Sequence, residues 1–374
     1  MPLYFGTIAM ADIKPDDEQR VKKSKIILPV LLSVAISGYL IATNFKPAAL
    51  AAIHFSPKLL LGLALALLAL IIRDSAFIYK VKLSAGEKLT WRKAVNAIVM
   101  WEFGAAITPK VAEVAFIFFV LKRSGLSYGR STGVMVLNAF MDNVVFVGLF
   151  GILYLFMGRH ILFVSPGCSE LGGDGMVQRL ILEVRHLAEN AWVGYAVFCA
   201  GATFFGIALF VLPQTSKRFF YRLSALPPLN RFQHSVRHLG DEIEITAREY
   251  KNQPRSFWIK MALATIINWT ARYSIVNALV FAFSAITPNM FEVLARQFVL
   301  WMFLVIPTTP GASGWAEITF MALNCDFMPA GQSMAIAIAS VWRIYTYYMY
   351  LLVGIVVLPG WLKRTAINAK TQAK

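Results

Sequence analysis

Long, almost uninterrupted apolar runs are the feature that most restricts how this chain can fold. Six windows contain few charged residues and are close to the length that crosses a bilayer as a helix. We place them at residues 26–43, 59–79, 128–157, 190–212, 257–283 and 332–358. Hydrophobic residues make up 58% of the chain, whereas a soluble domain is about half apolar. The sequence therefore predicts an all-α, polytopic membrane protein.

Basic residues are distributed unevenly among the segments between these runs. If the chain begins inside, the inner segments hold 25 Lys and Arg and the outer segments hold five. Five of the inner ones lie at 80–93, where Lys80 follows the second run. The asymmetry predicts a multi-pass protein of the inner (plasma) membrane with both termini cytoplasmic. The same asymmetry indicates that the net charge of +16 sets the membrane topology and attracts anionic lipid headgroups, and does not bind nucleic acid.

Two further apolar segments, about 91–106 and 291–306, are too short to span comfortably. Each ends at a break that contains proline, ITPKVAE (107–113) or PTTPGASGWAE (307–317), and a second short apolar piece follows. A helix, a break and a second helix form a re-entrant hairpin, whose irregular backbone must be buried in protein or line a polar cavity. The alternative is a pair of proline-kinked spans.

The second break has the composition of a hairpin tip. Gly311 and Gly314 permit unusual φ angles and close backbone approach. Pro310 can begin the returning half-helix, and Glu317 should lie just inside it. Unpaired amides at that helix start would favour an anionic group.

The two halves of the chain follow the same order of span, span, hairpin and span. Pro109 precedes Asp142 by 33 residues, and Pro310 precedes Arg343 by 33 residues. The first half starts inside and the second starts outside, which is typical of the inverted repeats of transporters. The predicted parts are a cytoplasmic tail at 1–25, a membrane domain at 26–360 with repeats at about 26–157 and 190–358, a basic cytoplasmic connector at 213–256, and a second cytoplasmic tail at 361–374.

Ten ionisable residues fall inside the predicted membrane segments, where each costs roughly 2.5–3.5 kcal/mol or more at a helix centre. One interpretation is a polar pathway for a charged headgroup, with Arg272 and Arg343 contacting phosphate. The other is a set of structural ion pairs. For Glu292 and Arg296, near a membrane edge, we expect an interfacial position. The ten are Arg73, Asp74, Glu102, Glu113, Asp142, Arg272, Glu292, Arg296, Glu317 and Arg343.

The three cysteines, Cys168, Cys199 and Cys325, fit no metal or redox spacing. Cys168 and Cys325 both fall on the predicted outer side. We expect free thiols there, with a disulfide between the two as the alternative.

Three stretches resemble known motifs. PTTPGASGWAE resembles the Pro-x-Pro-Gly-Gly-x-Gly-x-x-Glu stretch of the lysylphosphatidylglycerol synthase transmembrane family, the flippase-like, UPF0104-type membrane proteins. VWRIYTYYMYLLVG (341–354) is similar to that family's Tyr-Arg-x-x-Thr-Tyr helix, and TPKVAEVAFIFFVLKRSGLS (108–127) to its Pro-x-x-x-Gly-Glu segment. Asp142 matches the aspartate of the next helix. The resemblance covers about residues 25–360.

The first half departs from the family pattern at three positions. Ala112 precedes Glu113 where the family often has Gly. Ala115 and Ala139 stand where it often has Arg. These differences imply altered headgroup contacts in the first half and a different lipid.

The resemblance implies a translocator that moves a polar or charged lipid between leaflets, without the soluble synthase domain of two-domain members. The implied partner is a membrane phospholipid or lipid-linked substrate, and we expect no catalytic residue, metal or cofactor. The alternatives are a membrane transferase acting on lipid-linked sugar or aminoacyl groups, and a membrane partner of a separate synthase. The candidate pathway residues are Glu113, Asp142, Arg272, Pro310, Gly311, Gly314, Glu317, Arg343 and Tyr347, with Arg73, Asp74 and Glu102 as secondary candidates.

Overall fold

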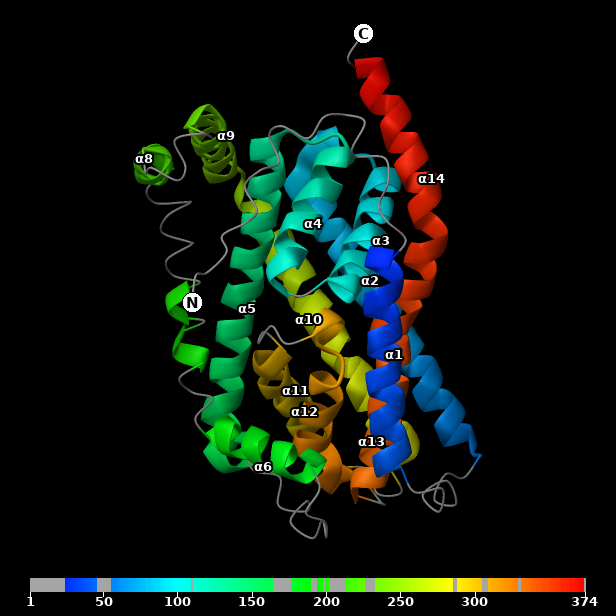
Figure 1. Cartoon of the computed structure of the whole chain (residues 1–374). Helices are drawn as coiled ribbons and strands as arrows, with labels where there is room; N and C mark the ends of the chain where they lie inside the picture. Colours follow the sequence, from blue (N-terminus) through cyan, green and yellow to red (C-terminus); the bar gives the residue numbers. More distant parts are fainter. Residues whose placement is uncertain are drawn as a thin grey trace.

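The described residues form helices and contain no strand. Within this described part, three helices are long and apolar enough to cross a membrane, and most helices run along one long axis (Figure 1). The predicted all-α membrane class is therefore confirmed. The computed structural model describes residues 24–45, 55–108, 110–163, 176–189, 194–197, 199–201, 213–225, 233–284, 288–304, 309–328 and 331–372.

An antiparallel pair of helices, α2 (Pro57–Ala85) and α10 (Arg255–Phe283), crosses the centre of the molecule (Figure 1). At one end the helices approach so closely that a Cβ on Gly62 would lie 2.5 Å from the Cβ of Ala282. Small residues allow this approach, and close packing stabilises helix pairs in lipid, where apolar burial contributes little.

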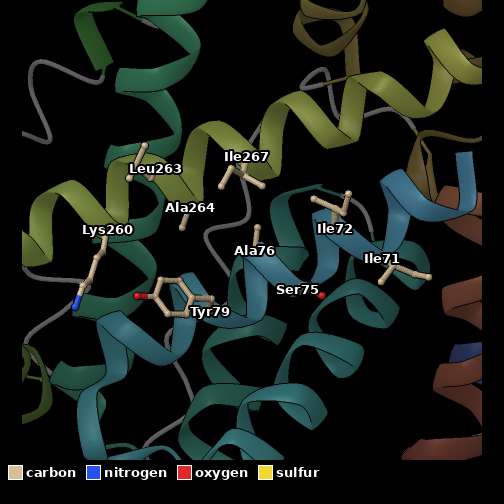
Figure 2. A pocket seen from close by; sticks show the side chains of 9 residues that line it. All are labelled: Ile71, Ile72, Ser75, Ala76, Tyr79, Lys260, Leu263, Ala264 and Ile267. Carbon is tan, nitrogen blue, oxygen red and sulfur yellow. The ribbon is translucent and has the colours of Figure 1, made fainter. Parts of the chain in front are cut away.

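The outer side of this pair carries a groove of about 430 Å³. Figure 2 shows apolar side chains from both helices along it, with Lys260 and Tyr79 at one end. Ile71 and Leu263 are each 54% exposed. Because large apolar side chains remain exposed here, this face of the pair suits contact with lipid chains.

Two helix–break–helix units approach the middle from opposite ends (Figure 1). The first consists of α3 (Trp91–Ile107) and α4 (Lys110–Arg123). The second consists of α11 (Met290–Leu304) and α12 (Trp315–Asn324). The predicted short helices on each side of a break are thus present. Short 3₁₀ turns occupy Gly86–Lys88, Pro310–Ala312 and Cys325–Phe327.

Two more long helices flank the hairpins. Helix α1 (Ser24–Asn44) packs beside α13 and the tip of the second hairpin. Helix α5 (Tyr128–Phe163) packs against both α11 and α9, and bends at Gly158, where φ is 74°. The side chains of Phe146 and Phe150 in α5 are buried in the largest apolar core.

The last long helix is interrupted near its middle. It begins as α13 (Gly331–Arg343), widens into a π-helical turn at Ile344–Tyr348, and continues as α14 (Met349–Gln372). Pro359 lies inside α14 without ending it. Such π turns often occur at functional sites because they change the direction of side chains.

Amphipathic helices lie at the two ends of the molecule (Figure 1). Helix α6 (Met176–Glu189) crosses one end, and Ile181 and Val184 are buried there. Helices α8 (Pro213–Ser224) and α9 (Gln233–Lys251) lie at the other end, together with the C-terminal end of α14.

Ion pairs join α8 to α9. The ammonium of Lys217 lies 2.7 Å from Asp241 and 3.1 Å from Glu244. The hydrogen bond from Lys217, with help from Arg248, holds the pKa of Glu244 below its usual value. Hydrogen bonds to the same two carboxylates raise the pKa of Lys217. Lys217 and Arg248 therefore have carboxylate partners within this connector.

Two predicted boundaries can be compared with the described helices, and two other predicted segments fall largely outside the described residues. Helix α2 continues to Ala85, so Lys80 belongs to the membrane bundle and not to a loop. Helix α14 continues to Gln372, so the segment predicted as a tail at 361–374 is mostly helical. The predicted tail at 1–25 and the span at 190–212 lie largely outside the described residues.

The cysteine prediction also changes. Cys325 is disulfide-bonded, so the expectation of a free thiol there is wrong. Cys199 is a free thiol, and Cys168 lies outside the described residues.

Candidate functional site

The tip of the second hairpin depends on two glycines. Gly311 has φ 58° and Gly314 has φ 85°, a region that residues with a Cβ rarely adopt. A Cβ on Gly311 would lie 2.0 Å from the ring of Tyr347. Position 311 therefore requires glycine both for its backbone angle and for the space that the ring occupies.

Glu317 closes this tip from the first turn of α12. Its carboxylate accepts a hydrogen bond from the backbone amide of Gly314 at 2.7 Å and one from the hydroxyl of Ser37 at 2.9 Å. The Nε of Arg343 lies 3.3 Å from it, and Glu317 is 1% exposed. The amides that we expected to attract an external anion thus have a carboxylate of the chain itself beside them. Helix α12 begins at Trp315 and not at Pro310, which lies in the preceding 3₁₀ turn.

Arg343 binds the backbone of the same tip. Its Nη2 donates to the carbonyl of Gly311 at 2.9 Å and to the hydroxyl of Ser313 at 3.0 Å. The guanidinium lies 4.0 Å from the ring centroid of Tyr347, whose hydroxyl donates to the carbonyl of Ala106 at 3.1 Å. Arg343 and Tyr347 therefore connect the last helix to both hairpins.

A second charged cluster lies between α2, α3 and α14. Arg73 is 3% exposed and forms ion pairs with Asp74, at 2.8 Å, and with Glu102. It also donates to the hydroxyl of Tyr350 at 2.7 Å, and Tyr350 donates to Asp74 at 2.6 Å. These groups pair with one another across three helices, which lets their charges remain buried, although the Nε of Arg73 has no hydrogen-bond partner among the described residues.

Asp142 pairs with a residue that we had assigned to a cytoplasmic loop. Lys80 is fully buried in α2 and forms an ion pair with Asp142. The indole of Trp269 donates to the same carboxylate at 2.8 Å. A sequence signal for Lys80 exists, because Arg73, Phe77 and Lys80 share one face of a helix.

Arg272 is the cavity cation with the fewest bonds to protein. Its nearest carboxylate is Glu102, at 3.9 Å. The guanidinium lies between two indoles, 5.4 Å from the ring centroid of Trp269 and 5.4 Å from that of Trp301. Its Nε is buried and has no hydrogen-bond partner within the described part of the chain.

These residues surround a cavity of about 290 Å³ to which both halves of the chain contribute. Pro310, Gly314, Glu317, Arg73 and Asp74 do not line it, although Glu317, Arg73 and Asp74 pair with or adjoin residues that do. The described residues hold no cluster of three or more His, Cys, Asp and Glu able to bind a metal ion. Of the predicted residues, the cavity brings together Glu102, Glu113, Asp142, Arg272, Gly311, Arg343 and Tyr347.

Helix α10 contributes to the cavity lining three buried polar atoms that have no hydrogen-bond partner among the described residues: the Oδ1 of Asn268, the Nε of Arg272 and the hydroxyl of Tyr273. All three belong to one face of α10. Asn268 and Tyr273 are each 4% exposed. A buried polar atom without a partner is unfavourable by about 1–3 kcal/mol, so this lining is suited to a polar ligand or to water.

Arg296 forms a separate buried cluster near α12. It is 2% exposed and contacts Glu292 at 2.6 Å and Asp326 at 2.7 Å. It also donates to the carbonyl of Leu323 at 2.9 Å. Its carboxylate partners thus hold Arg296 inside the protein, whereas its expected position near a membrane edge stays a prediction.

The comparisons with known proteins agree with this architecture. The profile of the family described as the lysylphosphatidylglycerol synthase TM region matches residues 26–354. The chain belongs to this family. A relative within the same class of proteins, described as a UPF0104 membrane protein of Archaeoglobus fulgidus, is 24% identical over 270 residues, which cover 72% of this chain and 76% of the relative. No solved structure matches the chain.

The family match contains all the cavity residues named above, from Glu102 to Tyr347. Three residues that complete the charged clusters were missed by the sequence reasoning: Ser37, Lys80 and Tyr350. Ser37 and Tyr350 carried no signal, because a hydroxyl in an apolar helix is not unusual by itself.

Proposed function

We propose that this protein translocates a lipid with a charged headgroup between the two leaflets, and that the headgroup passes through the cavity between the hairpins. The observation that carries the proposal is the face of α10 in that cavity. Arg272, Asn268 and Tyr273 each present a buried polar atom there that no other described residue hydrogen-bonds. A phosphate group can accept hydrogen bonds from Arg272 and Tyr273.

The cavity dimensions fit a headgroup better than a whole lipid. Its volume is about 290 Å³, at the low end of the roughly 300–1,000 Å³ typical of ligand pockets. Acyl chains would stay in the bilayer while the headgroup crosses. Arg73 of α2 and Arg272 of α10 both lie near Glu102, so positive charge from both halves of the chain gathers beside the cavity.

We further propose that the transported lipid carries a cationic group besides its phosphate. The family is named for the membrane region of a synthase whose product is an aminoacylated phospholipid. Glu102, Glu113 and Asp142 all line the cavity. Carboxylates facing a cavity can attract an ammonium group, while Arg272 supplies the charge for phosphate.

The test measures headgroup translocation in proteoliposomes with a tail-labelled aminoacylated phospholipid. The variants are Arg272→Gln and Arg272→Lys, and the matched control is Lys260→Gln, in the same helix but on the outer groove (Figure 2). We expect the glutamine variant to lose roughly 10- to 100-fold in rate per folded molecule, the value of a hydrogen-bonded charge. The lysine variant should also translocate the lipid more slowly, because an ammonium group cannot make the paired hydrogen bonds that a planar guanidinium makes to phosphate. An unchanged translocation rate in Arg272→Gln would exclude passage of the headgroup through this cavity.

Mass spectrometry of the same lipids decides between translocation and the transferase alternative. A transferase changes the mass of the lipid when given an aminoacyl or sugar donor, whereas a translocator leaves it unchanged. Modified lipid from purified protein would replace the present proposal. Translocation that appears only after a separate synthase is added would favour the membrane-partner alternative.

A further inference from the structure

A second pocket, of about 250 Å³, lies where one end of α14 meets the first hairpin. Arg92 and Lys93 come from the start of α3, Arg123 from the end of α4, and Arg364 from α14. No Asp or Glu is among the residues that line it. It is separate from the central cavity, with which it shares no lining residue.

Three of the four cations of this pocket lack a carboxylate partner among the described residues: Arg92, Lys93 and Arg364 form no ion pair there. At the same end of the molecule, Lys217 and Arg248 have carboxylate partners. Four cations around one small space repel one another unless an anion lies between them.

The start of α3 adds a second source of positive potential. Thr90 is the N-cap residue, but its side chain makes no capping hydrogen bond, and the first turn contains no acidic residue. The amides of a helix start carry partial positive charge and bind phosphate readily. Thr90 itself and Ser124 place hydroxyl groups in the pocket lining.

The surroundings indicate a lipid as the source of that anion. Trp361 lines the pocket, and tryptophan is typical of the boundary between headgroups and chains. One to three turns before it on α14, Leu352 and Val356 are 67% and 79% exposed. The helix that supplies Arg364 to the pocket thus also exposes large apolar side chains, which suit the acyl chains of surrounding lipid.

We infer that this basic pocket binds the phosphate of an anionic phospholipid from the leaflet at the α8–α9 end. This inference does not depend on the proposed translocation. The bound lipid connects α3, α4 and α14, so it stabilises the first hairpin at the end opposite its tip. Helix α3 also carries Glu102, which lines the central cavity. Binding of the lipid to the basic pocket therefore holds one wall of the central cavity in place.

The experiment measures binding and thermal unfolding of the purified full chain in detergent. The probes are phosphatidylglycerol, phosphatidylcholine and inorganic phosphate. The test variant combines Arg92→Gln, Lys93→Gln and Arg364→Gln, all exposed residues whose replacement should not prevent folding. The matched control is Lys260→Gln, which removes an exposed charge outside the pocket.

For the unaltered protein and the control, we expect phosphatidylglycerol to bind and to raise Tm more than phosphatidylcholine does. The triple variant should bind phosphatidylglycerol roughly a hundredfold more weakly, about fivefold for each removed charge. A second variant with Arg92→Lys and Arg364→Lys keeps the charges, so it should bind phosphatidylglycerol more tightly than the triple variant does, although it lacks the two guanidinium groups.

Three results would overturn the inference. The first is equal loss of binding in the Lys260→Gln control, which would indicate non-specific attraction. The second is unchanged phosphatidylglycerol binding in the triple variant. The third is stabilisation by inorganic phosphate at the same concentration as by phosphatidylglycerol, which would make the ligand a soluble anion and not a lipid.

Discussion

Single charged residues inside this molecule are held by partners on other helices. Lys80 of α2 reaches Asp142 of α5, and Arg343 reaches Glu317 of α12. Such pairs contribute little net stability, because desolvation offsets much of their attraction. Removing one partner is strongly destabilising, since the other charge then remains buried without a counter-ion.

The replacement Lys80→Met tests this at a fully buried position. We expect the variant to lose about 3–5 kcal/mol of unfolding free energy, because Asp142 loses its counter-ion. The double variant Lys80→Met with Asp142→Asn should recover part of this loss. Chemical unfolding in detergent gives the comparison, with Lys82→Met in the same helix as the control. Equal effects of the two lysine replacements would contradict the buried pair.

At Gly311 the backbone and a ring both exclude larger residues. The variant Gly311→Ala should lose roughly 3 kcal/mol, because alanine at φ 58° is strained and its Cβ overlaps the ring of Tyr347. Adding Tyr347→Ala should relieve the overlap but not the strain. Gly148→Ala is the control, since no atom lies within 4 Å of the added Cβ there. Thermal unfolding measures all three, and an unaltered Tm in Gly311→Ala would show that the tip differs from this geometry.

The sequence could identify which residues are unfavourable in a membrane, but not which partners they have. Arg73, Asp74 and Arg272 are evident as charges in apolar runs. The contacts of Arg73 and Arg272 with Glu102 depend on how α2, α3 and α10 pack together. The spacing of residues along the sequence does not determine that packing. Lys80 was assigned to a loop because topology counting treats a basic residue after an apolar run as cytoplasmic.

Among the structural elements, the start of α12 is organised by its own carboxylate. Glu317 accepts from the amide of Gly314 and lies beside Arg343, so the hairpin tip is closed from inside. Helix positions were predictable because apolar length and proline breaks define them. The first residue of α12 was not, since Gly314 and not Pro310 caps the helix.

The variant Glu317→Gln separates the two roles of this carboxylate. The amide side chain still accepts a hydrogen bond from Gly314, but Arg343 loses its counter-ion. We expect a loss of about 3 kcal/mol in stability. Ser37→Ala removes a single hydrogen bond to Glu317 and should cost about 1 kcal/mol.

Translocation assays on the same Glu317→Gln protein show whether the pair also serves transport. If the pair only holds the tip, the rate per folded molecule stays unchanged while Tm falls. If the rate falls in the fraction that remains folded, the tip itself takes part in movement of the headgroup.

For the whole molecule, orientation in the bilayer is the property that the proposed function most needs. Helices α9 and α6 lie at opposite ends (Figure 1). We propose that α9 is cytoplasmic, from the excess of basic residues on that side. In a Cys199→Ser background, a cysteine at Gln233 should react only with reagent on the inside, and one at Leu182 only with reagent on the outside. Labelling of Gln233→Cys from the outside alone would refute the topology and the inverted repeat.

The π-helical turn at Ile344–Tyr348 has a consequence for how this sequence can change over evolution. A π turn holds one more residue than the α-helical turn it replaces, so it is equivalent to a one-residue insertion. Deleting any one residue of the turn would restore ordinary periodicity and rotate the rest of the helix by about 100°. Tyr350 would then turn away from Asp74, to which its hydroxyl now donates a hydrogen bond. We therefore expect single-residue length changes here to be excluded in functional descendants of the chain, even where substitutions at the same positions are accepted.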